Sequence, residues 1–291
     1  MVAILDLGRR AGSASGATEA HIVDVLIAER APRLSASWAW PLARPALYAL
    51  LDYRKARAMA DRVAGLGGPA AMGYASALLG LKVTARGLER LPRQGRVIVV
   101  ANHPTGLADG VAVDDAIRDL RPDRIYFANA DARRVSARLD EIFIPVEWVE
   151  AKRTRESIRL TVRRAQEALE AKRALVIFPA GRISRRRDGV LADLEWASSA
   201  LSLARRHHAP VLPIHLAGPP SRLFRLFDHF SSELRDITLF HELLNKHGGR
   251  FRLTVGPLIP AEAIGDPGET TPRLKAYVEQ VLPFHPDQPF A

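Results

Sequence analysis

The chain has 291 residues, of which 47% are hydrophobic and 25% charged, so it has enough apolar material for a globular domain of ordinary composition. Its net charge of +10 favours anionic partners, which include nucleic acid, anionic lipid, phosphorylated ligands and acidic carrier proteins. It contains no cysteine, which excludes disulfides, thiolate metal sites and a cysteine acyl-enzyme.

Residues 1–20 are small and polar, and we expect a flexible leader there because Gly12 to Gly16 is rich in glycine and serine. In Met1 to Gly12 the arginines follow the apolar run, which is the reverse of their order in a secretory signal. No uncharged apolar stretch reaches the roughly 18–20 residues that a membrane-spanning helix needs. We therefore expect a soluble or peripheral protein without a secretory signal.

Residues 21–81 have the apolar spacing of helices and are predicted to form an N-terminal helical extension. An apolar stretch with Trp38, Trp40 and Tyr48 precedes a basic run, and this combination is typical of a segment at a membrane interface. The same pattern fits helices that pack on their own domain with the tryptophans in the core. Both interpretations stay open.

Residues 82–291 follow a different pattern. Val97–Ala101 is a continuous run of apolar, mostly β-branched residues, as expected of a strand that is buried on both faces. Similar runs occur at Arg124–Ala128, Ile142–Val146, Ala174–Phe178, Val211–Leu216 and Arg250–Val255. Helical segments lie between them, and in the clearest, Ser157–Lys172, the predicted buried face is Ile158, Val162, Ala165 and Leu169. This alternation predicts an α/β fold with a mostly parallel central sheet flanked by helices.

The first buried strand runs into Asn102, His103 and a short segment that ends at Asp109. In an α/β sheet, ligands bind where the strands end. An aspartate six positions after a histidine can fold back to hold one ring nitrogen, which makes the other nitrogen a base for a hydroxyl proton. The structural alternative is that His103 stabilises a loop and that Asp109 belongs to the first turn of a helix.

A second polar segment follows the strand at Ala174–Phe178 and has the sequence Pro179-Ala180-Gly181-Arg182-Ile183-Ser184-Arg185-Arg186-Arg187. Backbone N–H groups at a glycine turn, together with guanidinium groups, predict a site for a phosphate. The alternative is a basic face that only contacts solvent.

The two segments together resemble the lysophospholipid acyltransferase family, whose best-known members are the 1-acylglycerol-3-phosphate acyltransferases. Asn102 to Asp109 is similar to that family's Asn-His…Asp block, and Phe178 to Ser184 is similar to its Phe-Pro-Glu-Gly-Thr-Arg-Ser block. Ile142–Val146 and Ala209–Ile214 stand where the family has its second and fourth blocks. The resemblance covers about residues 80–258.

A closer likeness is to the hemolysin-like or ornithine-lipid-synthesis branch, because Glu242 to Lys246 is similar to the C-terminal part of that branch. The resemblance implies that His103 is the general base and that Asp109 orients it, so that an acceptor hydroxyl attacks a thioester directly. It further implies that the acceptor head group or the donor phosphate is bound by Asn102, Gly106, Pro179, Gly181, Arg182, Ser184 and Arg185.

The partners that this resemblance implies are a lysolipid acceptor, of the lysophosphatidic acid or lyso-ornithine lipid type, and an anionic membrane surface. Acyl-CoA or acyl-carrier protein would be the co-substrate, with no other cofactor. The protein is then expected in the cytoplasm, peripherally associated with the cytoplasmic membrane. His207, His208 and His215 do not have convincing ligand spacing, so we expect no metal site.

The chain departs from the family pattern at three places. Five residues separate His103 from Asp109 instead of the usual four, and Gly106 is expected to absorb the extra one. The family's glutamate is replaced by Ala180, and the arginine stands one position after the glycine instead of two. The second block has Glu147 and Trp148 in place of an arginine, for which Lys152, Arg153 or Arg155 would substitute. These changes leave the base intact and allow an acceptor without a phosphate.

Two other functions are alternatives to a transferase. A nucleic-acid-binding protein would have aromatic side chains interleaved with its arginines, and Arg182–Arg187 contains none, so no nucleic-acid partner is expected. A non-catalytic protein that binds or perturbs membranes on the same fold stays open, because the third block is altered.

Overall fold

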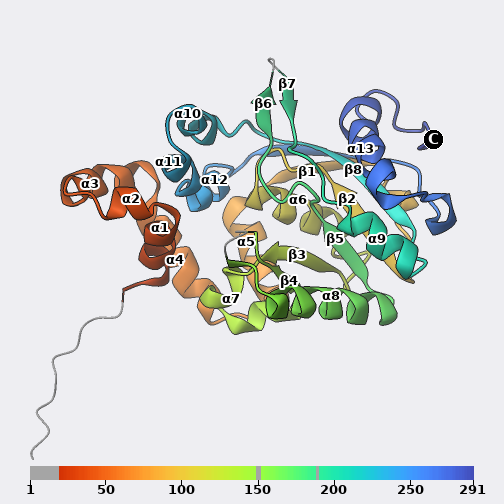
Figure 1. Ribbon diagram of the computed structural model, residues 1–291, viewed down its shortest axis with the longest axis horizontal. Coiled ribbons are helices and arrows are strands. Elements are labelled where there is room, and N and C mark those ends of the chain that lie inside the picture. The colour runs from red at the N-terminus through yellow and green to blue at the C-terminus, as the bar shows by residue number, and fades with distance from the viewer. Residues whose placement is uncertain (1–19, 149–151, 188–189) are drawn as a thin grey trace, which may run out of the picture.

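The computed structural model describes residues 20–148, 152–187 and 190–291 (Figure 1). The expected leader at residues 1–20 lies outside the described residues, apart from residue 20. The centre of the molecule is a seven-stranded sheet with the order β1-β9-β8-β2-β5-β3-β4. Its strands are β1 (Lys82–Arg86), β2 (Val97–Ala101), β3 (Ile125–Asn129), β4 (Phe143–Val146), β5 (Ala174–Ile177), β8 (Val211–Ala217) and β9 (Arg250–Val255). A separate two-stranded hairpin consists of β6 (Arg185–Arg187) and β7 (Val190–Ala192).

The sheet is mostly parallel, as predicted. Strands β8, β2, β5, β3 and β4 run in the same direction, whereas β9 is antiparallel to β8 and parallel to β1. The carboxyl ends of five strands therefore meet at one edge of the sheet, together with the amino ends of β9 and β1. This is the edge at which an open α/β sheet binds its ligands.

Helices cover both faces of the sheet. The helices that follow the first sheet strand are α6 (Leu107–Ile117), α7 (Ala132–Val135), α8 (Arg155–Glu170), α9 (Ser199–Arg206), α10 (Arg222–Phe230), α11 (Ser232–Asp236), α12 (Leu239–Leu244) and α13 (Pro267–Ala276). Val97 and Val99 of β2 pack in one apolar cluster with α6, and Ile98 and Val100 pack in another with α8, α9 and α13. All of β2 is buried because its side chains alternate between these two layers, which explains the uninterrupted apolar run.

The N-terminal part of the chain is helical, with α1 (Ile22–Arg30), α2 (Pro32–Ser35), α3 (Trp40–Leu50), α4 (Tyr53–Ala64) and α5 (Gly68–Leu79). Its apolar side chains share a third cluster with residues of α10 to α12. The carboxylate of Glu233 in α11 also accepts the backbone N–H groups of Arg33 (3.1 Å) and Leu34 (2.8 Å) in α2. Early and late segments of the chain therefore lie side by side at one end of the molecule (Figure 1).

The buried face predicted for α8 is partly wrong. Ala165 and Leu169 are buried, but Ile158 and Val162 are 52% and 44% exposed. The first half of the helix instead turns Thr161 toward the sheet, and its hydroxyl donates to the carbonyl of Pro145 at 2.6 Å. Across the described ranges, no helix combines the length and the apolar character needed to cross a membrane.

Candidate active site

His103 lies just beyond the carboxyl end of β2, beside the end of β5. Val97 of β2 and Ala174 of β5 are partners in the parallel register of these two strands, so the strands end next to each other at the same edge of the sheet. Phe178 directly follows β5, and its ring stacks on the imidazole of His103 with the ring centroids 4.5 Å apart. The fold therefore places the two polar segments of the sequence next to each other.

Asp109 lies in the first turn of α6 and is fully buried. Its carboxylate accepts the backbone N–H groups of Thr105 (2.8 Å) and Gly106 (2.9 Å) and the hydroxyl of Thr105. Gly106 has φ +88°, a value that favours glycine, and this turn brings the chain back toward His103 despite the additional residue. Nδ1 of His103 lies 3.0 Å from Oδ2 of Asp109, so the predicted pair is brought together.

The contact between His103 and Asp109 is close but not aligned as a full hydrogen bond. Nδ1 is buried, and within the described part of the chain no group hydrogen-bonds to it with good geometry. Catalytic hydrogen bonds are often long or poorly aligned before substrate binds. The proximity of the carboxylate favours a proton on Nδ1, which leaves Nε2 as the nitrogen that can accept one.

A second carboxylate, Asp193, contacts the backbone of His103. Asp193 is 6% exposed, and it accepts the N–H of His103 (3.0 and 3.1 Å to its two oxygens), the hydroxyl of Ser184 and the indole N–H of Trp196 (2.8 Å). Burial raises the pKa of Asp193, although these donors and the nearby imidazole act in the opposite direction. Sequence reasoning missed this residue, because no motif connects it to a histidine 90 positions earlier.

Four of the seven predicted binding residues are buried parts of the site's framework. These are Asn102, Gly106, Pro179 and Ser184. The side-chain amide of Asn102 exchanges two hydrogen bonds with the backbone of Leu216 (2.9 and 2.6 Å), which joins the end of β2 to β8. The backbone N–H of Ser184 donates to the carbonyl of His103 at 2.9 Å. These groups hold in place the loop at residues 102–106, which we call the His103 loop.

Gly181 does not provide the free amide that was predicted for a phosphate. Its N–H donates to the carbonyl of Phe178 at 2.9 Å and closes the turn after β5. With φ +61°, the residue also lies against the ring of Trp148, because a Cβ placed there would come within 2.1 Å of that ring. The glycine is therefore required by the turn and by this close approach.

The arginines around this turn form a cationic group between the hairpin and α10. Arg182 is exposed, and the half-buried Arg185 has its Nε 3.7 Å from Asp228 of α10. Burial and the neighbouring Arg235 lower the pKa of Arg185. Burial and Arg186 likewise lower the pKa of Arg225. We call Arg182, Arg185, Arg186, Arg225 and Arg235 the arginine cluster; such a concentration of like charge favours an anionic ligand.

Two of the basic residues proposed for the second block have other partners. Nζ of Lys152 is 2.8 Å from Glu29 of α1, and Nε of Arg153 donates to the backbone carbonyl of Glu147 at 3.0 Å. Arg155 is exposed in the first turn of α8. In the described residues, no group of three or more histidine, aspartate or glutamate side chains is arranged to hold a metal.

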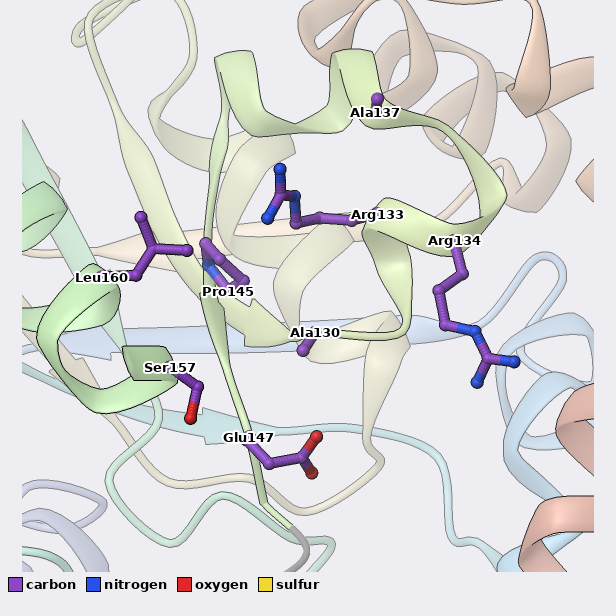
Figure 2. A pocket seen from close by; sticks show the side chains of 8 residues that line it. All are labelled: Ala130, Arg133, Arg134, Ala137, Pro145, Glu147, Ser157 and Leu160. Carbon is purple, nitrogen blue, oxygen red and sulfur yellow. The ribbon is translucent and has the colours of Figure 1, made fainter. Parts of the chain in front are cut away.

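Two cavities open at the same edge of the sheet, one on each side of His103, and His103 lines neither. The first has a volume of about 350 Å³ and lies by β4, α7 and the start of α8, with Arg133, Arg134, Glu147 and Ser157 as its polar lining (Figure 2). The second has a volume of about 780 Å³ and lies where β8 ends beside β9 and β1. It adjoins the His103 loop, because a Cβ at Gly218 would meet Thr105 within 2.8 Å.

Parts of the chain are similar to known proteins. Residues 82–217 match the model of the acyltransferase family. The chain is 27% identical over 210 residues to the lyso-glycine lipid O-acyltransferase of Phocaeicola vulgatus, covering 70% of this chain and 73% of that protein. It is 25% identical to the enzyme of the same name from Bacteroides thetaiotaomicron, covering 70% and 75%. The crystal structure of the 1-acyl-sn-glycerophosphate acyltransferase PlsC from Thermotoga maritima superposes with a TM-score of 0.47 at 16% identity, over 90% of this chain and 97% of that one.

The family match runs from β1 to β8 and thus includes the His103 loop, Asp109 and the arginine-rich turn. The resemblance that the motifs indicated is confirmed, and so is the prediction that the protein is an enzyme. The part of the chain from residue 82 to residue 217 is therefore similar to the acyltransferase family.

Proposed function

We propose that the protein transfers a fatty acyl group from a thioester donor to the hydroxyl of a lysolipid. The observation that supports this most directly is the contact of 3.0 Å between His103 and the buried Asp109 at the carboxyl end of β2. The relatives that are named lyso-glycine lipid O-acyltransferases support a lysolipid as the acceptor.

In this proposal Nε2 of His103 takes the proton of the acceptor hydroxyl while its oxygen attacks the thioester carbonyl carbon. Asp109 holds the ring through Nδ1 and stabilises the imidazolium that forms. When the tetrahedral intermediate collapses, the C–S bond breaks and the thiolate receives the proton from His103. The products are an ester and a free thiol, and no covalent enzyme intermediate is required.

The arginine cluster is proposed to bind the anionic part of the acceptor head group. Guanidinium groups fit carboxylates and phosphates equally well, as both present paired oxygens. The engaged amide of Gly181 removes one expected phosphate ligand, and the named relatives act on an amino-acid lipid. We therefore favour an acceptor whose head group carries a carboxylate over lysophosphatidic acid.

The donor is proposed to be acyl-CoA or acyl-carrier protein, both of which are anionic and suit a chain with a net charge of +10. The protein would meet the acceptor at the surface of the cytoplasmic membrane, with the chemistry on the cytoplasmic side. Exposed apolar residues of the N-terminal helices support a peripheral association with that surface.

The assay is the transfer of a radiolabelled acyl chain to lysolipids in vesicles, with each donor supplied separately. His103→Ala should lower kcat by at least about 100-fold, since a positioned base contributes about 10²–10⁴ to such a step. His207→Ala is the matched control, because His207 caps the far end of α9 and should leave the rate unchanged. Retention of full activity by His103→Ala would remove this histidine from the mechanism.

The choice of acceptor is tested in the same assay with lyso-amino-acid lipid and lysophosphatidic acid at equal surface density. We expect kcat/KM to be at least tenfold higher for the amino-acid lipid. Arg185→Ala should reduce that value mainly through KM, because the side chain contacts the head group and takes no part in proton transfer. A preference for lysophosphatidic acid would contradict the proposed acceptor and leave the role of His103 unaffected.

A further inference from the structure

Asp193 holds the backbone of His103, whereas Asp109 approaches its ring. Both oxygens of Asp193 lie within 3.1 Å of the His103 N–H, and Ser184 connects the two residues a second time. Its hydroxyl donates to Asp193, and its backbone N–H donates to the carbonyl of His103. The main chain of His103 is therefore fixed on both its N–H and its C=O side by one buried network.

The charge on Asp193 has an unusual environment. Its three donors are a backbone amide, a hydroxyl and an indole, and all three are neutral. Among the described residues, no lysine or arginine pairs with it, and the basic side chain that lowers its pKa is His103. A buried carboxylate is costly without a cation. This cost falls when the neighbouring imidazole becomes positively charged.

We propose that Asp193 is a positioning residue for acyl transfer: it fixes the backbone of His103, and its buried charge stabilises the imidazolium that forms during the reaction. This inference rests on the proposed role of His103 as the base. Asp193 contacts neither substrate in this scheme and acts through His103 alone.

Other titratable groups near His103 also belong in the interpretation of a pH profile. Asp109 approaches from α6, and Glu279, in the π-helical turn Tyr277–Val281, accepts the backbone N–H of Asp193 at 2.7 Å. Arg182 and Arg185 belong to the segment that follows β5, and His215 lies in β8, the strand that pairs with β2. Replacing Asp193 leaves all of these unchanged.

Asp193→Asn is the decisive variant. With its oxygen in the place of Oδ2, an asparagine can still accept from His103 and Trp196, and its NH₂ group can donate to the Ser184 hydroxyl. The variant therefore removes the charge, reverses the Ser184 hydrogen bond and leaves one oxygen instead of two facing the His103 N–H. With less stabilisation of the imidazolium, His103 should stay neutral to lower pH. We expect the acid limb of the kcat/KM profile to move down by about 0.5–1 pH unit. We also expect kcat to fall about three- to tenfold, with the acceptor KM within twofold of wild type.

Glu279→Gln is the matched control. It neutralises a carboxylate that contacts Asp193 and does not contact His103, and its amide oxygen can still accept the backbone N–H of Asp193. Its acid limb should coincide with that of the wild type. A titration of the His103 ring resonances by NMR, assigned by their loss in His103→Ala, gives the same comparison without turnover. An unmoved titration in Asp193→Asn, or an equal movement in Glu279→Gln, overturns the inference. If His103→Ala is fully active, the proposed function fails instead.

Discussion

At the scale of single residues, two glycines allow the turns that place His103, Asp109 and the segment after β5 next to one another. Gly106 turns the chain so that Asp109 returns to His103, and its Cα lies against Ile183, which a Cβ would approach within 2.8 Å. Gly181 makes the turn beneath Trp148. Both positions combine a positive φ with a close neighbour, so an alanine would meet backbone strain and steric overlap together.

The two penalties can be separated by a pair of alanine variants. Gly80→Ala introduces a Cβ at φ +51° with nothing within 4 Å, and it should lower the free energy of unfolding by about 1 kcal/mol through backbone strain. Gly181→Ala adds a clash with the Trp148 ring, and it should lower the free energy by about 2–4 kcal/mol. Urea denaturation measures both values. Equal losses would show that Trp148 does not pack against Gly181 in solution.

The sequence predicted that His103 and Asp109 form a pair, but it predicted only part of their surroundings. His103 and Asp109 stand in a recognisable motif next to a strand of continuous apolar residues. Asn102 and Ser184 were predicted to contact ligands, but their polar atoms are satisfied by Leu216 and Asp193. Those partners come from distant segments, and a single sequence does not reveal such pairings.

At the scale of elements, the first helix is attached to the α/β layers by charge. Glu29 of α1 binds Arg134 of α7 through both carboxylate oxygens at 2.8 Å, and it also pairs with Lys152. Arg30 forms a second link to Asp131 at 2.6 Å. Hydrogen bonds from Arg134 and then Lys152 lower the pKa of Glu29 from its ordinary value of 4.5 to about 2.

Glu29→Gln should therefore destabilise the protein in a pH-dependent way. Glu29 is about one-third exposed, so solvent screening limits the loss to about 1 kcal/mol at pH 7. A lowered folded pKa contributes stability above pH 4.5 and loses it as the pH falls toward 2. The difference in unfolding free energy between wild type and variant should shrink to about half near pH 3. For Glu262→Gln, at an exposed surface position, the difference in unfolding free energy from the wild type should not shrink as the pH falls.

Strand prediction succeeded for the longer apolar runs and failed for strands that are polar or only three residues long, such as β1, β6 and β7. Six runs predicted as strands correspond to β2, β3, β4, β5, β8 and β9. β1 was missed because it is a largely exposed edge strand with lysine and arginine at its ends, and β6 was missed because it consists of three arginines. Short polar strands carry no periodic signal, since the pairing of their backbones defines them.

At the scale of the whole molecule, several strongly exposed apolar side chains lie at the end formed by the N-terminal helices and α10. Trp38 and Leu42 are 87% and 77% exposed, and Leu226 and Phe230 of α10 are exposed nearby. Phe284 is 75% exposed and belongs to the C-terminal segment, which lies at the other end of the molecule from α1 to α4 (Figure 1). This distribution agrees with the proposal of a peripheral membrane association, in which the N-terminal helices would enter the lipid surface.

Replacing Trp38 and Leu42 together by serine should weaken binding to anionic vesicles by about tenfold or more, because each side chain loses apolar burial in the interface. Phe284→Ser removes a similarly exposed ring at the other end and should bind as the wild type does. Co-sedimentation with vesicles measures both variants. Raising the salt concentration should also release the wild type, since exposed charges are screened over about 8–10 Å. Equal losses in the two variants would exclude a specific docking end.

The contact between Glu233 and the backbone of Arg33 and Leu34 has a consequence for synthesis on the ribosome. Translation produces α2 about 200 residues before the carboxylate that caps it. During that interval, the nascent N-terminal helices lack the apolar partners that α10 to α12 later provide. A product truncated before Glu233 would therefore leave an uncovered apolar surface, and we expect it to depend on chaperones or to aggregate.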